Sequence, residues 1–440
     1  MRRSKALVIA GALAAVLVLF GGGLGGTPAD HVLRIDSSPA AEQDSLGALI
    51  AGFSTRNTAA YVGKLEQRVA ANPADGDALT LLGLAYQQRA RETGDPTFYG
   101  LSDRALRRAA AAGGHRPLIL QGRAALANTR HRFQAGLALA RRSIRLDPGN
   151  GSAYGALGDA LLNVGRYDGA FRTYDQMAVL APGIASYTRV ANARELVGRP
   201  AAAAEADQLA LQADSTVPEQ VAWTMVQLGN IRFNTGRLSA AAGAYRQALA
   251  HLPGYVHAEA GRARVEASEG RYPRAIARLW HIVDVLPIPA YVIMLGDVLH
   301  VSGREPEARR EYALVGVIER LFAANGVRTE LQTALFDLDH NRNVADALAR
   351  ARVAYSSAPS IYAEDAVALG LLRSGRCGEA REHSAHALRL GTRDALLVFH
   401  RAMIERCLGD PSARSWFRRA LAINPHFSFL WTPVARREAR

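Results

Sequence analysis

The sequence has little cysteine, almost no lysine and few aromatic residues. Only two of its 440 residues are cysteine, which excludes a disulfide-rich scaffold and a zinc site with four cysteine ligands. Lys5 and Lys64 are the only lysines, so the formal net charge of +13 comes almost entirely from arginine. Aromatic residues make up 7% of the chain, which argues against an aromatic-rich β-sandwich as the main fold.

The motifs of common catalytic sites are also missing. The sequence contains no P-loop, no HExxH, no GxSxG and no dinucleotide-binding fingerprint. We therefore expect no enzymatic activity and no cofactor. Nucleic acid is not an expected partner either, because no stacking aromatic residues are interleaved with the arginines.

Small residues are abundant. The chain has 83 alanines and 40 glycines, and 49% of its residues are hydrophobic. This composition is sufficient to bury a core and favours closely packed helices over a disordered chain. The sequence therefore predicts an all-α protein.

The N-terminus has the pattern of an export segment. Two arginines and Lys5 precede an uncharged run from Ala6 to Gly26, whose most apolar part has about 15 residues. This pattern is that of a signal peptide or a signal-anchor helix, with both alternatives open, over residues 1–29. Residues 30–43 read as a linker. Because basic residues before an apolar run stay inside, we expect the rest of the chain to lie outside the cytoplasm, secreted or anchored to the cytoplasmic membrane.

A repeat with a period near 34 residues follows. The dipeptide Gly-Arg begins at positions 165, 198, 236, 270, 303 and 375, and Gly409 follows 34 residues after the last of these. Apolar and small residues lie on one helical face before each link and again after it, and a proline ends each unit. Each unit is therefore predicted to be two antiparallel helices with a glycine at the link.

This unit resembles the tetratricopeptide repeat. In that family a small residue on the first helix lets the second helix pack closely, and here these are Gly158, Gly229 and Gly296. A small residue on the second helix faces it, and a proline closes the unit; the matching positions are Ala170, Ala241, Ala275 and Ala308, and Pro148, Pro182, Pro253, Pro287 and Pro425. The resemblance implies a right-handed solenoid of about ten units over residues 44–425, with a cap and basic tail over 426–440.

Two stretches depart from the pattern. An insert, RETGDPTFYG, makes the array irregular at 89–100. The unit after Gly303 lacks its proline and predicts a longer helix, so that 316–345 is a second irregular stretch. The units expose apolar surface until a neighbour covers it, and the array is expected to fold as one stack.

The resemblance also implies a binding groove. In this family the residue after the small position on the first helix points toward the inner groove, and a residue one turn later lies near it. The implied peptide-binding residues are Asp159, Asn163, Asn192, Asn230, Asn234, Arg264, Asp297 and His300. They would hold an extended peptide through amide hydrogen bonds, although asparagine is common at this position in the family whatever the ligand.

Three further patterns each have a functional and a structural interpretation. Glu379, His383 and His386 share one helical face, which is either a site for zinc or nickel or an ordinary polar face. Cys377 and Cys407 lie at the same edge of the stack and form either a disulfide or two buried free thiols. Paired arginines on second helices either contact anionic surfaces or form a solvated face; they are Arg107-Arg108, Arg141-Arg142, Arg309-Arg310 and Arg418-Arg419.

The sequence thus predicts a non-catalytic adaptor outside the cytoplasm that binds a protein or peptide along a concave groove. One alternative is an envelope scaffold that binds anionic surfaces through a basic convex face. The other is a metal-dependent accessory protein that uses Glu379, His383 and His386.

Overall fold

The computed structural model describes residues 57–213 and 217–440. Within them the chain forms 22 helices and no strand. The predicted export segment, the linker and the start of the array at residues 44–56 lie outside the described residues. No helix in the described ranges is long and apolar enough to cross a membrane.

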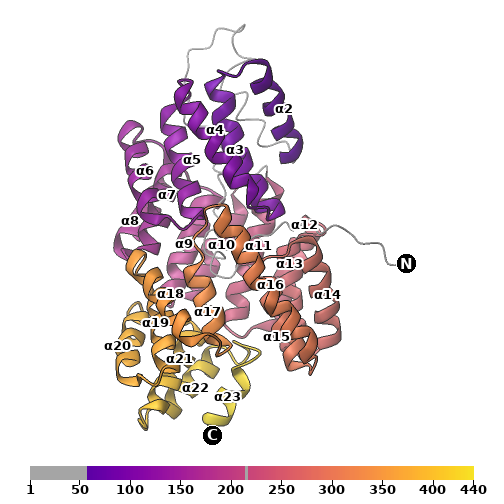
Figure 1. Cartoon of the computed structure of the whole chain (residues 1–440), viewed down its shortest axis with the longest axis vertical. Helices are drawn as coiled ribbons and strands as arrows, with labels where there is room; N and C mark the ends of the chain where they lie inside the picture. Colours follow the sequence, from indigo (N-terminus) through magenta and orange to yellow (C-terminus); the bar gives the residue numbers. More distant parts are fainter. Residues whose placement is uncertain (1–56, 214–216) are drawn as a thin grey trace, which may run out of the picture.

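Ten consecutive helix pairs form the array, between a single helix at the start and another at the end (Figure 1). The first half contains α2 (Thr58–Ala71), α3 (Gly76–Thr93), α4 (Thr97–Ala111), α5 (Arg116–Thr129), α6 (Phe133–Leu146), α7 (Gly151–Asn163), α8 (Tyr167–Leu180), α9 (Ile184–Leu196), α10 (Pro200–Gln212), α11 (Pro218–Asn234) and α12 (Leu238–His251). The second half contains α13 (Val256–Ser268), α14 (Tyr272–Val285), α15 (Pro289–Val301), α16 (Glu305–Ala324), α17 (Glu330–Asp339), α18 (Val344–Ser357), α19 (Ile361–Arg373), α20 (Cys377–Ala387), α21 (Ala395–Cys407), α22 (Ala413–Ile423) and α23 (Thr432–Glu438). The pairs run from α3/α4 to α21/α22.

A glycine and a tyrosine bring the two helices of a pair together. A Cβ atom on Gly158 would lie 2.3 Å from the ring of Tyr174, and Gly229 and Gly296 have the same relation to Tyr245 and Tyr312. Only glycine allows this approach, because any side chain on the first helix would overlap the ring. The expected role of these three glycines is therefore confirmed.

The tyrosine hydroxyl then bonds the residue after the glycine. Tyr174 donates to Asp159 (3.0 Å), Tyr245 to Asn230 (2.8 Å), and Tyr312 to the carboxylate of Asp297 (2.8 Å). Because the hydroxyl is buried between the helices, leaving it without a hydrogen-bond partner would destabilise the folded state. The same tyrosine thus joins the two helices of a pair through an apolar contact with the glycine and a hydrogen bond to the residue that follows it.

The two irregular stretches are mostly helical. In the first, α3 extends to Thr93 and α4 already begins at Thr97, so the link is only Gly94–Pro96. Its Tyr99 and Ala90 pack into the apolar cluster formed by α13 to α17. In the second, α16 is 20 residues long, and the shorter α17 has 10.

The array curls until its C-terminal half meets its N-terminal half (Figure 1). Four successive links within the pairs α5/α6 to α11/α12 contact the four links that precede α17, α19, α21 and α23, and we call this line of contacts the seam. At one end of the seam Arg328 donates its backbone N–H to the carbonyl of Arg130. Further along, the backbone N–H of Ile361 donates to the hydroxyl of Tyr167, 194 residues earlier, at 2.7 Å.

Glycines make the rest of the seam close. A Cβ atom on Gly165 would lie 2.4 Å from the carbonyl oxygen of Pro359, and one on Gly198 would lie 2.3 Å from that of Gly391. The next glycine, Gly236, lies against the ring of Pro425, whose Cδ would be 2.9 Å from its Cβ. These three positions have positive φ angles as well. They need glycine both for the turn and for the approach of the other half.

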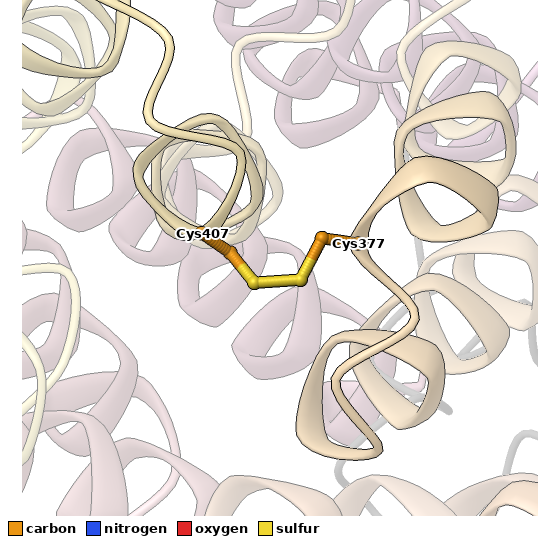
Figure 2. The surroundings of a disulfide bond; sticks show 2 residues. All are labelled: Cys377 and Cys407. Carbon is orange, nitrogen blue, oxygen red and sulfur yellow. A yellow bond between two sulfur atoms is a disulfide. The ribbon is translucent and has the colours of Figure 1, made fainter.

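A disulfide joins two neighbouring pairs near the C-terminus (Figure 2). It connects Cys377, at the start of α20, to Cys407, at the end of α21, with Cα atoms 6.1 Å apart. Cys377 is buried and Cys407 is exposed. The bond fixes the edge of the pair α19/α20 to the pair α21/α22.

The seam predicts two classes of link glycine. We expect Gly198→Ala to lower the free energy of unfolding by clearly more than Gly270→Ala, the matched control. Gly270 also has a positive φ, but nothing lies within 4 Å of its would-be Cβ, so its substitution should cost about 1–2 kcal/mol from the backbone alone. Urea denaturation of both variants measures the difference, and equal losses would show that the seam does not constrain Gly198.

Candidate functional site

The first helices of seven consecutive pairs line one central cavity of about 550 Å³. They run from α9 to α21, Asp207 of α10 and Glu319 of α16 add to the wall, and the segment 424–431 completes the lining at the C-terminal end. Residues from the two sides of the seam therefore face each other across the cavity. Its volume lies in the range of small-molecule and side-chain binding sites.

Five of the eight predicted groove residues line this cavity. They are Asn192, Asn230, Asn234, Arg264 and Asp297. The rule that the residue after the small position points inward thus holds for α9, α11, α13 and α15.

The other three predicted residues lie elsewhere. Asp159 is buried in a bidentate ion pair with Arg189, with nitrogen–oxygen distances of 2.8 and 2.9 Å. Asn163 lines a small separate pocket of about 40 Å³ and donates to the backbone carbonyl of Asp159. His300 is exposed, and its Nδ1 lies 2.7 Å from Glu305. These residues do not form one ladder with the five in the cavity.

Three of the five cavity residues already have hydrogen-bond partners within the protein, and one of them, Asn234, donates to Glu195 at 3.0 Å. Asn230 accepts from Tyr245, and Asp297 accepts from Tyr312 while lying 2.8 Å from Nε2 of His340. Burial would lower the pKa of His340, but its hydrogen bond with Asp297 raises it above the ordinary value. Asp297 and His340 therefore form a hydrogen-bonded pair that links α15 to the end of α17.

The pair α9/α10 breaks the tyrosine pattern. Asn192 matches Asn230 in position, and the residue 15 positions later is Asp207 instead of a tyrosine. The side chain of Asp207 is fully buried, and neither of its carboxyl oxygens has a hydrogen-bond partner within the protein. Both amide atoms of Asn192 are buried and lack a protein partner as well. Both residues line the cavity, so its wall carries an unsatisfied polar site here.

Other carboxyl groups surround this point. Burial raises the pKa of Asp207 well above its ordinary value, and the nearby carboxyl of Glu195 adds to the rise. Glu195 accepts from Asn234 at 3.0 Å, yet burial and Asp394 raise its pKa too. Asp394 comes from across the seam, where it caps α21 by accepting from the backbone N–H of Leu396, and burial raises its pKa. Three carboxyl groups thus lie close enough in a poorly solvated place for Glu195 to raise the pKa of Asp207 and for Asp394 to raise that of Glu195.

The cations near these acids are few. The guanidinium of Arg264 lies 3.8 Å from the centre of the Phe233 ring, and burial lowers the pKa of Arg264. Burial would also lower the pKa of His400, but Asp365 (2.8 Å) and Asp339 raise it to about 10. The His400 charge is therefore committed to those two acids.

Further polar atoms of the lining are buried without a partner. They are Nε2 of Gln227, Oε1 of Gln332 and Nε1 of Trp431. The three residues come from α11, from α17 and from the start of α23, respectively. Buried polar atoms are nearly always hydrogen-bonded in folded proteins, so those around this cavity need partners from water or from a bound molecule.

The candidate metal residues do not converge. Glu379 forms an ion pair with Arg376, while His383 lies 2.7 Å and His386 3.6 Å from Glu364 on α19. Among the residues that the structure describes, no group of three or more histidine, cysteine, aspartate or glutamate side chains could hold a metal ion.

Sequence reasoning missed Asp207, Glu195 and Asp394. A signal for the first was present, because Asp207 occupies the position where three other pairs carry a tyrosine 15 residues after an Asp or Asn. Nothing in the sequence places Asp394 beside Glu195, because that neighbourhood exists only once the array curls. The arrangement as a whole can bind a polar or charged group, and it contains no evident nucleophile paired with a base.

The buried acid predicts a pH effect on stability. The folded state holds the Asp207 proton more tightly than the unfolded chain does, so its contribution to stability falls as pH rises above the ordinary pKa of 3.8. We expect Asp207→Asn to raise the free energy of unfolding at pH 7 by about 1–3 kcal/mol and to make it less dependent on pH. Urea denaturation between pH 4 and pH 8 tests this, and a variant less stable than the parent at pH 7 would contradict it.

Comparisons with known proteins find distantly similar solved structures and one matching family model. One similar solved structure is a human IFIT1 dimer with PPP-AAAA. The alignment covers 86% of this chain and 89% of the other, at 13% identity and a TM-score of 0.44. Against the Cut9–Hcn1 hetero-tetramer of APC/C it covers 91% and 97%, at 11% identity and a TM-score of 0.34. No curated protein sequence matches it. A family model described as the tetratricopeptide repeat matches residues 119–183 and 226–279, which confirms that these two segments are such repeats.

Proposed function

We propose that the protein is a non-catalytic binding scaffold that holds a segment of a protein or peptide partner in its central cavity. A tetratricopeptide-repeat fold is consistent with a protein-interaction scaffold. Such scaffolds gain affinity from many contacts on a surface that is already formed before binding.

The observation that carries this proposal is the set of unsatisfied polar atoms around the cavity. Asn192, Gln227 and Gln332 are amide side chains, and each has at least one buried atom without a partner in the protein. An amide side chain both donates and accepts, as a peptide backbone does. A bound peptide segment would supply those hydrogen bonds, and the three amides come from three different helices around the cavity.

The geometry changes the form of the expected groove. Two residues of the predicted ladder are not available to an extended peptide in the cavity, because Asp159 forms an ion pair with Arg189 and His300 lies outside the cavity. The residues that converge lie on α9 to α21, so the bound segment would enter the centre of the curl. We therefore propose a cavity that takes a short segment or a chain end.

We also propose that the protein works outside the cytoplasm. The basic and then apolar N-terminus supports this location. The disulfide between Cys377 and Cys407 gives separate support, because such bonds form and persist in oxidising compartments. Whether the leader is cleaved or stays as an anchor does not change the orientation expected for the array.

The outer surface offers a second candidate function. All four arginine pairs on second helices are exposed: Arg107-Arg108 on α4, Arg141-Arg142 on α6, Arg309-Arg310 on α16 and Arg418-Arg419 on α22. A contact between this face and an anionic surface of the cell envelope would weaken with salt, because exposed charges are screened.

Site-specific photo-crosslinking tests the cavity as the binding site. In cells that naturally make the protein, we expect a photo-crosslinking phenylalanine derivative in place of cavity residue Trp223 to give a discrete partner adduct. The same label at exposed Arg246 should give none. With the label at Trp223, Asn192→Ala should lower the adduct yield about tenfold, because it removes hydrogen bonds worth about 1–1.5 kcal/mol.

The matched control for that experiment is His300→Ala. His300 belongs to the ladder that the sequence predicts but lies outside the cavity, so this variant should crosslink as the parent does. Equal losses in the two variants would favour an extended ladder over the cavity. The same adduct from labels at Trp223 and at Arg246 would contradict the cavity as the binding site.

Thiol chemistry tests the location. Protein isolated from its native cells under alkylating conditions should show no free thiols until it is reduced. Cys407→Ser should lower the free energy of unfolding by about 2–4 kcal/mol, because the disulfide constrains the unfolded chain between residues 30 positions apart. Two free thiols in the native protein would contradict an oxidising location.

A further inference from the structure

The cavity and the whole chain have opposite charge. The chain carries a formal net charge of +13. Three arginines line the cavity, Arg189, Arg264 and Arg393. They face seven carboxyl side chains, namely Glu195, Asp207, Asp297, Glu319, Asp339, Asp365 and Asp394. Carboxyl groups concentrated in a concave, poorly solvated site of a basic protein attract a cation.

Part of this acidity is neutralised within the protein. Asp297 is paired with His340, and Asp365 and Asp339 lie on either side of His400. Of the arginines, Arg189 is committed to Asp159, and Arg393 is exposed at the rim. The carboxyl groups that keep no cationic partner within hydrogen-bonding distance are those of Glu195, Asp207, Glu319 and Asp394.

Asp207 is the clearest of these. Its side chain is fully buried in the wall, and both of its oxygens lack a partner within the protein. A tyrosine at this position would close the pair as it does in three others. An aspartate leaves acceptors in its place, beside the unpartnered amide of Asn192. A buried carboxyl is costly unless a donor or a positive charge meets it.

Aromatic side chains complete the surroundings. Trp223, Tyr362 and Trp431 line the same cavity, and the face of an aromatic ring attracts a cation within about 6 Å of its centre. The protein already makes such contacts here, since Arg264 lies over Phe233 and Arg373 over Trp431. His257 adds no positive charge, because burial lowers its pKa to about 4.

We propose that the cavity recognises a primary ammonium group, with Asp207, assisted by Glu195 and Asn192, as the recognition site. An ammonium group has three donors and no acceptor, which matches the unpartnered carboxyl oxygens of Asp207 and the unpartnered amide oxygen of Asn192. This inference rests on the proposed binding function and specifies its ligand. The group belongs either to a lysine side chain or chain end of a partner peptide or to a small free amine, and a cavity of about 550 Å³ admits both.

Calorimetry on the full chain at pH 8 separates these sources. The probes are 1,5-diaminopentane, a neutral peptide with one central lysine and a blocked N-terminus, and the same peptide with that lysine acetylated. We expect the diamine or the lysine peptide to bind and the acetylated peptide to fail, because acetylation removes the charge. Binding of the diamine alone identifies a small amine as the source, and binding of the lysine peptide identifies a peptide side chain.

Two variants make the test specific. Asp207→Asn keeps the shape but cannot ionise to meet the ammonium group, and it should weaken binding of the amine about thirtyfold or more, as the loss of a buried charge partner does. Glu205→Gln is the matched control, because Glu205 lies exposed on the same helix, and it should bind as the parent does. The Asp207→Asn variant is expected to be at least as stable as the parent, so weaker binding would not reflect unfolding.

Two results would overturn the inference. One is that neither amine probe gives binding heat with the parent protein. The other is that Asp207→Asn binds the probes as tightly as the parent. The proposed function survives both results if the label at Trp223 still gives a partner adduct, and it fails separately if that adduct is missing while the amine binds.

Discussion

The close contact between two halves of one helical array underlies the rest of the structure. Links in the N-terminal half lie against links about 194 residues later in the chain. The hydrogen bond from Ile361 to Tyr167 is one of these contacts. Where a glycine stands at the seam, as at Gly198, its missing side chain leaves room for the carbonyl of Gly391. Without these contacts the array would remain an open superhelix, and the first helices would face solvent.

The seam turns a repeated surface into a single site. In an open solenoid each first helix contributes polar residues to a long shallow groove. Here the first helices from α9 to α21 face one cavity, and Asp394 from one half meets Glu195 from the other. Burial then makes these carboxyl groups harder to ionise than they are in water. The chemistry of the site therefore depends on the curvature as much as on the residues.

The sequence predicts the repeating unit well because that unit is set by local constraints. A glycine at most links, small residues between paired helices and a closing proline each have a purely local cause, and the family resemblance is confirmed in residues 119–183 and 226–279. The missing proline after Gly303 likewise corresponds to the 20-residue helix α16. The positions of the groove residues follow less directly from the sequence. Asp159 and Asp297 are the same residue at the same repeat position, yet Asp159 forms an ion pair with Arg189 and Asp297 lines the cavity.

The long-range features could not be predicted from local patterns. Gly198 and Gly270 look alike in sequence and both adopt positive φ angles, yet only Gly198 touches the other half of the array. The degree of curling sums small rotations over many pairs, and no single residue reports it. The aspartate at position 207, where other pairs carry a tyrosine, is visible in the sequence. Its role in a binding site can be inferred only once the cavity beside it is known.

The charge distribution now has a physical description. Exposed arginine pairs keep the outer surface basic, while the unpaired carboxyl groups line the interior of the curl. By its charge, the outer surface would therefore attract anions and the cavity would attract cations.

The distance between the two sides of the seam tests this account most directly. Spin labels on cysteines introduced at the exposed positions Arg199 and Arg393 would flank the contact between Gly198 and Gly391. Double electron–electron resonance on the full chain in solution should then give one short and narrow distance distribution. A long or broad distribution would show an open superhelix, and the cavity with its acidic lining would not exist in the form described.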